Sequence, residues 1–336
     1  MQHGTTRDPS WPSGRGGALM DQARDRMAGW LNAQPDEVSF GPSTTANHYV
    51  LAQALRTYLR PGDEFIVTNQ DHEANIGAWR RLENDGMVIR EWQVDPDSGE
   101  LETHDLENLL TDRTRVAAFT HCSNIVGSVN PVREWADKAR SAGAMVIVDG
   151  VSYAPHGLPD VDALGADIYL FSLYKVYGTH LGVMVMRKAI NEQLPNQGHF
   201  FNKDYTTSRF TPAGPDHAQI AAANGVMDYF EAVYQHHWGE DDATQAQKTS
   251  RVRALFQHTE RRNVRPLLDF LSDRPAVRMI GKKMTRHRAP TVSFTVDGRL
   301  PGDIAAQLAK RDIGIANGNC YAYRLMQALS IPPEQG

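Results

Sequence analysis

The stretch MVIVDGVSYAPHGLPDVDALGADIYLFSLYKVYGTHLGVMVMR, residues 145–187, decides the fold of this chain. It contains three short apolar runs, at 145–148, 168–171 and 181–186. Their length and their β-branched or aromatic residues are typical of buried strands. The turn between the last two runs is too short for a helical crossover. We therefore predict that these two strands are antiparallel or that their pairing is distorted.

Two of these predicted strands are followed or closed by side chains with reactive groups, a carboxylate and an amine. Asp149 closes the first strand, and Lys175 lies in a Ser-Leu-Tyr-Lys turn just past the second. Taken alone, the aspartate would be read as a helix cap or metal ligand and the lysine as a solvated charge. Together, at the carboxyl ends of neighbouring strands, they meet the needs of pyridoxal phosphate. Such a lysine forms a Schiff base, and the aspartate keeps a proton on the pyridine nitrogen. We expect Lys175 to be buried.

The bulk composition excludes several classes of protein. At 336 residues the chain can form one large domain and a smaller one. The net charge of −5 and the lack of a Lys/Arg block predict no nucleic-acid partner. No apolar run approaches a membrane span, and the first residues lack the apolar core of a signal peptide. The two cysteines, Cys122 and Cys320, form no disulfide framework or metal cluster, so a cytoplasmic location is expected.

The order of predicted elements favours an α/β domain with a mostly parallel sheet. Residues 1–17 are rich in Gly, Pro and Ser and are expected to be irregular. A helix is expected at Met20–Leu31, a strand at Glu37–Phe40 and a helix ending at Leu59. Further strands are expected near residues 64–68, 87–92, 116–120, 145–148, 168–171 and 181–186, with helical segments between most of them.

The character of the chain changes after Arg187. Residues 217–262 are expected to be helical, followed by a strand at Pro290–Val296, a helix at Pro301–Arg311 and a strand at 314–316. We therefore predict a large cofactor-binding domain at 18–240, including the start of a linker helix, and a smaller, incomplete α+β domain at 241–336. The last residues, 331–336, resemble a turn that leads into a further strand.

Polar groups suited to the cofactor follow other predicted strands. Ser43-Thr44-Thr45 lies between a strand and a helix N-terminus, where free N–H groups favour a phosphate, although plain N-capping would use the same residues. Ser172 could add a hydroxyl. His72, in Asp-His-Glu-Ala-Asn, could stack on the ring or be a surface histidine. Asn124, in Thr-His-Cys-Ser-Asn, could donate to the ring hydroxyl. Ligands collect at the carboxyl ends of strands in open α/β sheets.

In these motifs and their order, the chain resembles the class V aminotransferases of the pyridoxal-phosphate-dependent fold type I. This superfamily includes the cysteine desulfurases and the isopenicillin N epimerase-like proteins. The resemblance runs from about Asp21 to Leu329 and implies a large domain with a mostly parallel sheet and a small α+β domain. It implies that Lys175 carries the cofactor, Asp149 holds the pyridine nitrogen and His72 stacks on the ring. The remaining contacts that it implies are made by Thr44, Thr45, Asn124, Ser172 and, more weakly, Ser152.

The chain also departs from the family pattern. Desulfurases carry a persulfide-forming cysteine in a loop of the small domain, and Leu325-Met326 places Tyr321 at that position and Cys320 one residue before it. The arginine that precedes this cysteine in the family has no counterpart. The family's substrate-binding arginine lies on a strand that would begin where this sequence stops. We therefore expect a family member that is truncated at both ends and is not a working cysteine desulfurase.

The resemblance implies an enzyme that acts on a small-molecule amino-acid substrate as an aminotransferase, epimerase or lyase. It also implies a homodimer in which the loop around Gly214 reaches the partner's phosphate. One alternative is a catalytically impaired homologue that only binds the cofactor. A remote alternative is a serine hydrolase that uses Ser172 and Lys175 as a Ser-x-x-Lys pair. That mechanism needs its serine at the start of a helix and two further motifs, neither of which occurs in the sequence.

Overall fold

The computed structural model describes residues 12–332, which belong to two compact units, each built from two segments of the chain. The first unit comprises residues 1–58 and 157–254, and the second comprises 59–156 and 255–336. The domain boundaries expected from the sequence, 18–240 and 241–336, stay a prediction.

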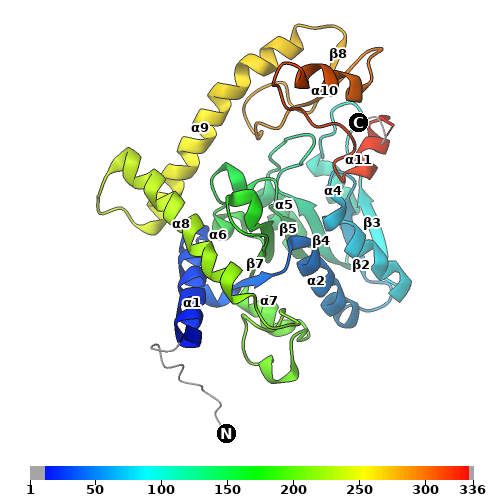
Figure 1. Ribbon diagram of the computed structural model, residues 1–336. Helices are drawn as coiled ribbons and strands as arrows, with labels where there is room; N and C mark the ends of the chain where they lie inside the picture. The colour runs from blue at the N-terminus through cyan, green and yellow to red at the C-terminus, as the bar shows by residue number, and fades with distance from the viewer. Residues whose placement is uncertain (1–11, 333–336) are drawn as a thin grey trace. The chain divides into compact units, whose positions relative to one another are not determined.

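The first unit begins with a helix that starts earlier than expected. Helix α1 spans Pro12–Leu31, so the expectation of an irregular segment up to residue 17 is wrong from Pro12 onward. Residues 1–11 lie outside the described part of the chain. Proline suits the first turn of a helix because its missing N–H is not needed there. The three glycines that follow are tolerated because α1 packs along α8 (His217–Trp238), as Figure 1 shows.

The strands of the first unit are antiparallel. Strand β7 (Gly182–Met186) pairs with β1 (Val38–Gly41) on one side and with β6 (Ile168–Ser172) on the other. The antiparallel pairing of β6 with β7, predicted from the short turn between them, is confirmed. The other elements of this unit are η1 (Pro35–Glu37), α2 (Thr44–Tyr58), α6 (Val161–Leu164), η5 (Leu173–Val176), α7 (Lys188–Gln193), η6 (Phe200–Asn202) and the first part of α9 (Gln245–Ser272).

The second unit contains four parallel strands in the order β5-β4-β2-β3. They span Met145–Asp149, Thr114–Thr120, Glu64–Thr68 and Val88–Trp92 in that order. Their helical connections are η2 (Glu73–Asn75), α3 (Gly77–Arg80), η3 (Arg81–Asp85), α4 (Thr103–Leu109), α5 (Val132–Ser141) and η4 (Ala154–His156). Buried aromatic rings of Trp92, Phe119 and Trp135 meet edge to face against this sheet. Parallel pairing brings the carboxyl ends of the four strands to one edge.

The C-terminal part of the second unit is smaller. Strand β8 (Val277–Ile280), which the sequence did not indicate, pairs antiparallel with β9 (Ser293–Val296). Helices α10 (Pro301–Ala309) and α11 (Tyr323–Ala328) follow, and the strand expected at 314–316 does not form. The helical segment expected at 217–262 is interrupted after α8, where Gly239 takes a left-handed φ of 70°. Residues 333–336 lie outside the described range.

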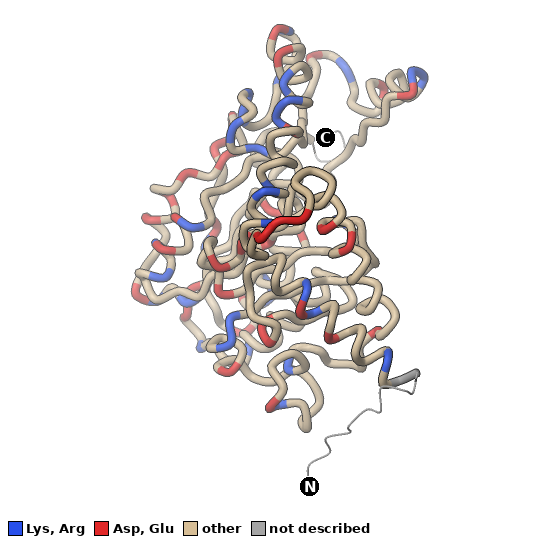
Figure 2. The backbone as a smooth tube through the Cα atoms, turned by 90° about the vertical axis from the view of Figure 1, so that its left-hand side faces the viewer, with Lys and Arg blue, Asp and Glu red and all other residues tan. Residues whose placement is uncertain are grey.

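The chain therefore has an α/β fold with a mostly parallel, seven-stranded sheet, which confirms the predicted fold class. Figure 2 shows that Lys and Arg are interspersed with Asp and Glu along the chain. Within residues 12–332, no helix is long and apolar enough to cross a membrane.

Candidate active site

In the first unit, the turn between β1 and α2 brings two predicted site residues together. Thr44 is buried, and its hydroxyl lies 2.7 Å from that of Ser172 at the end of β6. The Ser43 hydroxyl accepts the backbone N–H of Ala46 at 3.1 Å, so Ser43 performs the N-capping. Thr45 is exposed. The start of α2 thus keeps two adjacent threonine hydroxyls that are not used as helix caps.

Gly182 fixes how closely this turn approaches β7. A Cβ atom at Gly182 would lie 2.4 Å from the carbonyl carbon of Ser43 and 2.5 Å from the nitrogen of Thr44. Any larger residue would displace the main chain of the turn, because both neighbouring atoms belong to the backbone. The sheet therefore holds the helix N-terminus at a defined position beside Ser172.

Lys175 lies in the η5 turn after β6, between the buried Leu173 and Val176. Its side chain is exposed, so the expectation that it is buried is wrong. The 3-10 turn directs its first and last residues into the core, which leaves Tyr174 and Lys175 on the outer side. The lysine Nζ lies 5.7 Å from the centre of the Tyr174 ring, which itself stacks on His180 at 4.9 Å. Because Ser172 ends a strand and is followed by four 3-10 residues, it lacks the helical position that a Ser-x-x-Lys hydrolase needs.

In the second unit, Asp149 ends β5 and is only 4 % exposed. One of its carboxylate oxygens accepts the backbone N–H of Val151 at 2.8 Å. Burial raises the pKa of Asp149 to about 6, and the hydrogen bond from Val151 offsets this only in part. Ser152 is half-buried in the turn that follows. The end of β5 therefore carries a desolvated carboxylate.

Asp71 is a second buried carboxyl group that the sequence analysis did not assign. It is 1 % exposed, and it accepts a hydrogen bond from the Asn75 amide at 3.1 Å. Asn75 in turn accepts the indole N–H of Trp79 at 3.1 Å. Burial, and then the negative charge of Asp149, hold the pKa of Asp71 well above its usual range. A carboxylate directly before the predicted histidine was the signal that could have identified it.

His72 follows β2 and begins the η2 turn. Its Nδ1 accepts the backbone N–H of Ala74 at 3.0 Å, which orients the half-buried imidazole. The ring lies 5.2 Å from the ring of Tyr321, with an angle of 32° between their planes. The backbone N–H of Glu73 donates to the Tyr321 carbonyl at 2.7 Å. The loop that precedes α11 is thus attached to the loop that carries His72.

Asn124 makes the second attachment to the same loop. Its side-chain N–H donates to the Cys320 carbonyl at 2.9 Å. Its Oδ1 is buried and has no hydrogen-bond partner within residues 12–332. Cys320 and Tyr321 take left-handed φ values of 45° and 62°, which are costly for residues other than glycine and asparagine. The two attachments hold the loop in this conformation.

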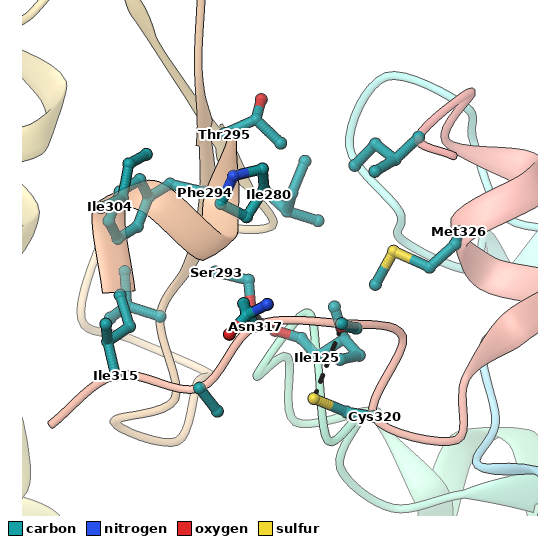
Figure 3. A pocket seen from close by; sticks show the side chains of 15 residues that line it. Ile125, Ile280, Ser293, Phe294, Thr295, Ile304, Ile315, Asn317, Cys320 and Met326 are labelled. Atoms are coloured by element: carbon teal, nitrogen blue, oxygen red, sulfur yellow. Dashed lines mark hydrogen bonds between the residues drawn. The ribbon is translucent and has the colours of Figure 1, made fainter. Parts of the chain in front are cut away.

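The two side chains of this strained pair have different surroundings. Tyr321 meets His72, whereas the exposed Cys320 lines a cavity of about 100 Å³ that includes both apolar residues, such as Ile125, and polar ones, such as Asn317. Figure 3 shows Cys320 among the residues that line this cavity. Its thiol contacts the Gly318 carbonyl at 3.6 Å. The other thiol, Cys122, is buried, which raises its pKa to about 12 and leaves it protonated.

The structure thus brings together Thr44 with Ser172 in one unit, and His72 with Asn124, through a shared loop, in the other. The role of Tyr321 as a neighbour of His72 was missed, because nothing in the local sequence links residues so far apart.

A fold of this kind, with polar groups at the ends of its strands, is shared by a class of known proteins. The family model for the class V aminotransferases matches residues 6–333, so the chain belongs to the class V aminotransferase family. Members of this family use pyridoxal phosphate and act on small-molecule amino-acid substrates.

The chain is similar to proteins that carry several different functional names. The chain is 36 % identical over 318 residues to the aminotransferase-like protein FGM3 of Gibberella zeae, a match that covers 93 % of this chain and 75 % of that protein. It is 32 % identical over 314 residues to the cysteine desulfurase-like protein ustD of Aspergillus flavus, covering 90 % and 68 %. The apo cysteine desulfurase of Thermococcus onnurineus NA1 shares the fold, with a TM-score of 0.81, 23 % identity and coverage of 97 % and 80 %.

Proposed function

We propose that this chain is a pyridoxal-phosphate-dependent enzyme that acts on an amino acid, with Lys175 as the residue that carries the cofactor. The observation that supports it best is Asp149, a carboxylate at the end of a buried strand whose burial raises its pKa to about 6. Such a group lacks a compensating cation, and a protonated pyridine nitrogen would supply one.

Other described residues fit the same cofactor. The hydroxyls of Thr44 and Thr45 and the N–H groups at the start of α2 would hold the phosphate, with Ser172 beside them. The oriented imidazole of His72 would stack on the ring. The side-chain N–H of Asn124, expected as a donor to the ring hydroxyl, is bonded to the Cys320 carbonyl, so its Oδ1, unpartnered within residues 12–332, would instead accept from that hydroxyl. Ser152 would make a weaker contact.

When bound, the cofactor withdraws electrons from the α-carbon of the attached amino acid. The residues of this chain would then determine the reaction. Asp149 would keep the proton on the pyridine nitrogen, and Lys175 would move a proton at the α-carbon as general base and acid. In the register that the resemblance implies, Tyr321 would stand where the desulfurases carry their cysteine, so we propose a transfer, epimerisation or lyase reaction other than sulfur abstraction.

We also propose that the enzyme is a cytoplasmic homodimer. The free thiols of Cys122 and Cys320 are compatible with a reducing compartment. In the first unit, Phe200 is 83 % exposed, and Phe201 and Tyr205 are each 61 % exposed. Aromatic side chains grouped at the surface are typical of protein contact sites, and a second copy of the chain would cover them.

Borohydride reduction of the cofactor-loaded protein, followed by peptide mass mapping, tests this function. We expect the reduced cofactor on Lys175, and no labelling in Lys175→Ala. Lys188→Ala is the matched control, because Lys188 is an exposed lysine of the same unit, and it should be labelled as the wild type is. A label on any other lysine would contradict the proposal.

The exposure of Lys175 favours one second candidate, a homologue that binds the cofactor without turnover. A labelled protein that processes none of the standard amino acids would identify this case.

A further inference from the structure

The loop that brings Tyr321 against His72 also forms a wall of a polar cavity in the second unit. The cavity has a volume of about 400 Å³. Six polar side chains line it, namely Glu73, Asn319, Tyr321, Tyr323, Arg324 and Gln327. Two of them, Glu73 and Tyr321, directly neighbour the loop and ring of His72. The cavity therefore adjoins the surroundings of the residue to which we assign the cofactor ring.

Arg324 is the cationic group of this cavity, and its pairing is incomplete. Its Nε lies 3.8 Å from the Glu73 carboxylate, which is close enough for an ion pair but too far for a hydrogen bond. Nε has no hydrogen-bond partner within residues 12–332. A guanidinium binds carboxylates best through two parallel hydrogen bonds, and Glu73 makes none of them.

The nearby Arg80 feels the negative charge of Glu73 as well as the positive charge of Arg324. It is bound to Glu91 in a close ion pair. Burial, and then the positive charge of Arg324, lower the pKa of Arg80. The two guanidinium groups thus repel one another, and an additional negative charge in the cavity would relieve this repulsion.

We propose that Arg324 binds a carboxylate of the amino-acid substrate in this cavity, in place of Glu73. The inference rests on the function proposed above and adds to it a carboxylate-recognising residue. The side chains of Tyr323, Asn319 and Gln327 offer further hydrogen-bond donors of the kind that such a ligand needs. A single guanidinium with neutral donors around it suits a carboxylate better than a doubly charged phosphate.

The test follows the absorbance of the bound cofactor while the loaded protein is titrated with L-aspartate, L-alanine and ethylamine, which has no carboxylate. Arg324→Gln should weaken binding of the recognised acid about tenfold or more, the loss expected for a charge-assisted hydrogen bond, and should leave ethylamine unchanged. Glu73→Gln should act in the opposite direction, because it removes the competing carboxylate. Arg262→Gln, at an exposed position outside the cavity, is the matched control.

The three compounds separate two sources of the carboxylate. Weaker binding of L-aspartate alone assigns Arg324 to an acidic side chain, and weaker binding of both amino acids assigns it to the α-carboxylate. Wild-type affinities for all three compounds in both Arg324→Gln and Glu73→Gln would overturn the inference while Lys175 is still labelled by borohydride. A protein that carries no cofactor would instead refute the function on which the inference rests.

Discussion

Replacing Asp149 with asparagine should stabilise the cofactor-free protein at neutral and alkaline pH. Asparagine is nearly isosteric and can still accept the hydrogen bond from the Val151 amide. It carries no charge, so it avoids the cost of an ionised group that is 4 % exposed. The same replacement should weaken cofactor retention, because the protonated pyridine nitrogen loses its partner. The two effects have opposite signs, which a loss of structure could not produce.

The magnitude follows from the pKa of Asp149, which rises from its ordinary value of 3.8 to about 6 on folding. A difference of about two units corresponds to about 3 kcal/mol. The folded state holds this proton more tightly than the unfolded state, so the free energy of unfolding falls as the pH rises from about 4 to about 6 and then levels off. In Asp149→Asn the free energy of unfolding does not fall in this way, because asparagine does not titrate. The substitution also removes the negative charge of Asp149 that repels Asp71, which stabilises the variant further.

Urea denaturation of both proteins without cofactor, at pH 4, 6 and 8, measures the effect. We expect the two free energies of unfolding to be similar at pH 4 and Asp149→Asn to be more stable by up to about 3 kcal/mol at pH 8. Asp162→Asn, at an exposed acidic position, should change little at any pH. A difference between wild type and Asp149→Asn that does not vary with pH would refute the reasoning.

Three further predictions follow from contacts described above. Thr44→Val should lower the free energy of unfolding by about 1–3 kcal/mol in urea denaturation, because it leaves the buried Ser172 hydroxyl without its partner, whereas the exposed Thr45→Val should have little effect. Cys320→Ser should leave any release of sulfide from cysteine unchanged, because Tyr321 rather than Cys320 lies against the ring of His72; a loss of release would show that Cys320 is a nucleophile. Light scattering should give the mass of a dimer, and Phe200→Ser should lower it towards the monomer; an unchanged mass would contradict an interface at this exposed ring.

Much of the fold could be predicted because buried strands are visible in the sequence as short apolar runs. The strands expected at 64–68 and 168–171 form as β2 and β6 within a residue or two, and the short turn after β6 indicated antiparallel pairing with β7. Strand β8 was missed, because a four-residue segment with an arginine in it carries little pattern. Helix α11 was missed because it spans only six residues.

The candidate site divides in the same way. Residues at or shortly after the end of a strand, such as Asp149 and His72, could be located because the apolar pattern of the strand shows where it ends. The surroundings of His72 could not be predicted, since the loop of Tyr321 is held there through its main-chain carbonyls, which place no constraint on the residue types of that loop. The left-handed backbone at Cys320 and Tyr321 has no glycine or asparagine to signal it. The exposure of Lys175 depends on which side of a 3-10 turn it occupies, which the apolar pattern does not specify.

The pairing of β1 with β7 has a consequence for synthesis on the ribosome. Val38 lies opposite Val185, so the partner of β1 emerges about 150 residues later. At ~5–20 residues per second, β1 waits on the order of ten seconds or more with its apolar residues and main-chain groups unpaired. The second unit completes its four parallel strands during that interval, since β2 to β5 end at Asp149. Nascent chains of this protein should therefore depend on chaperones most strongly before β7 has left the exit tunnel.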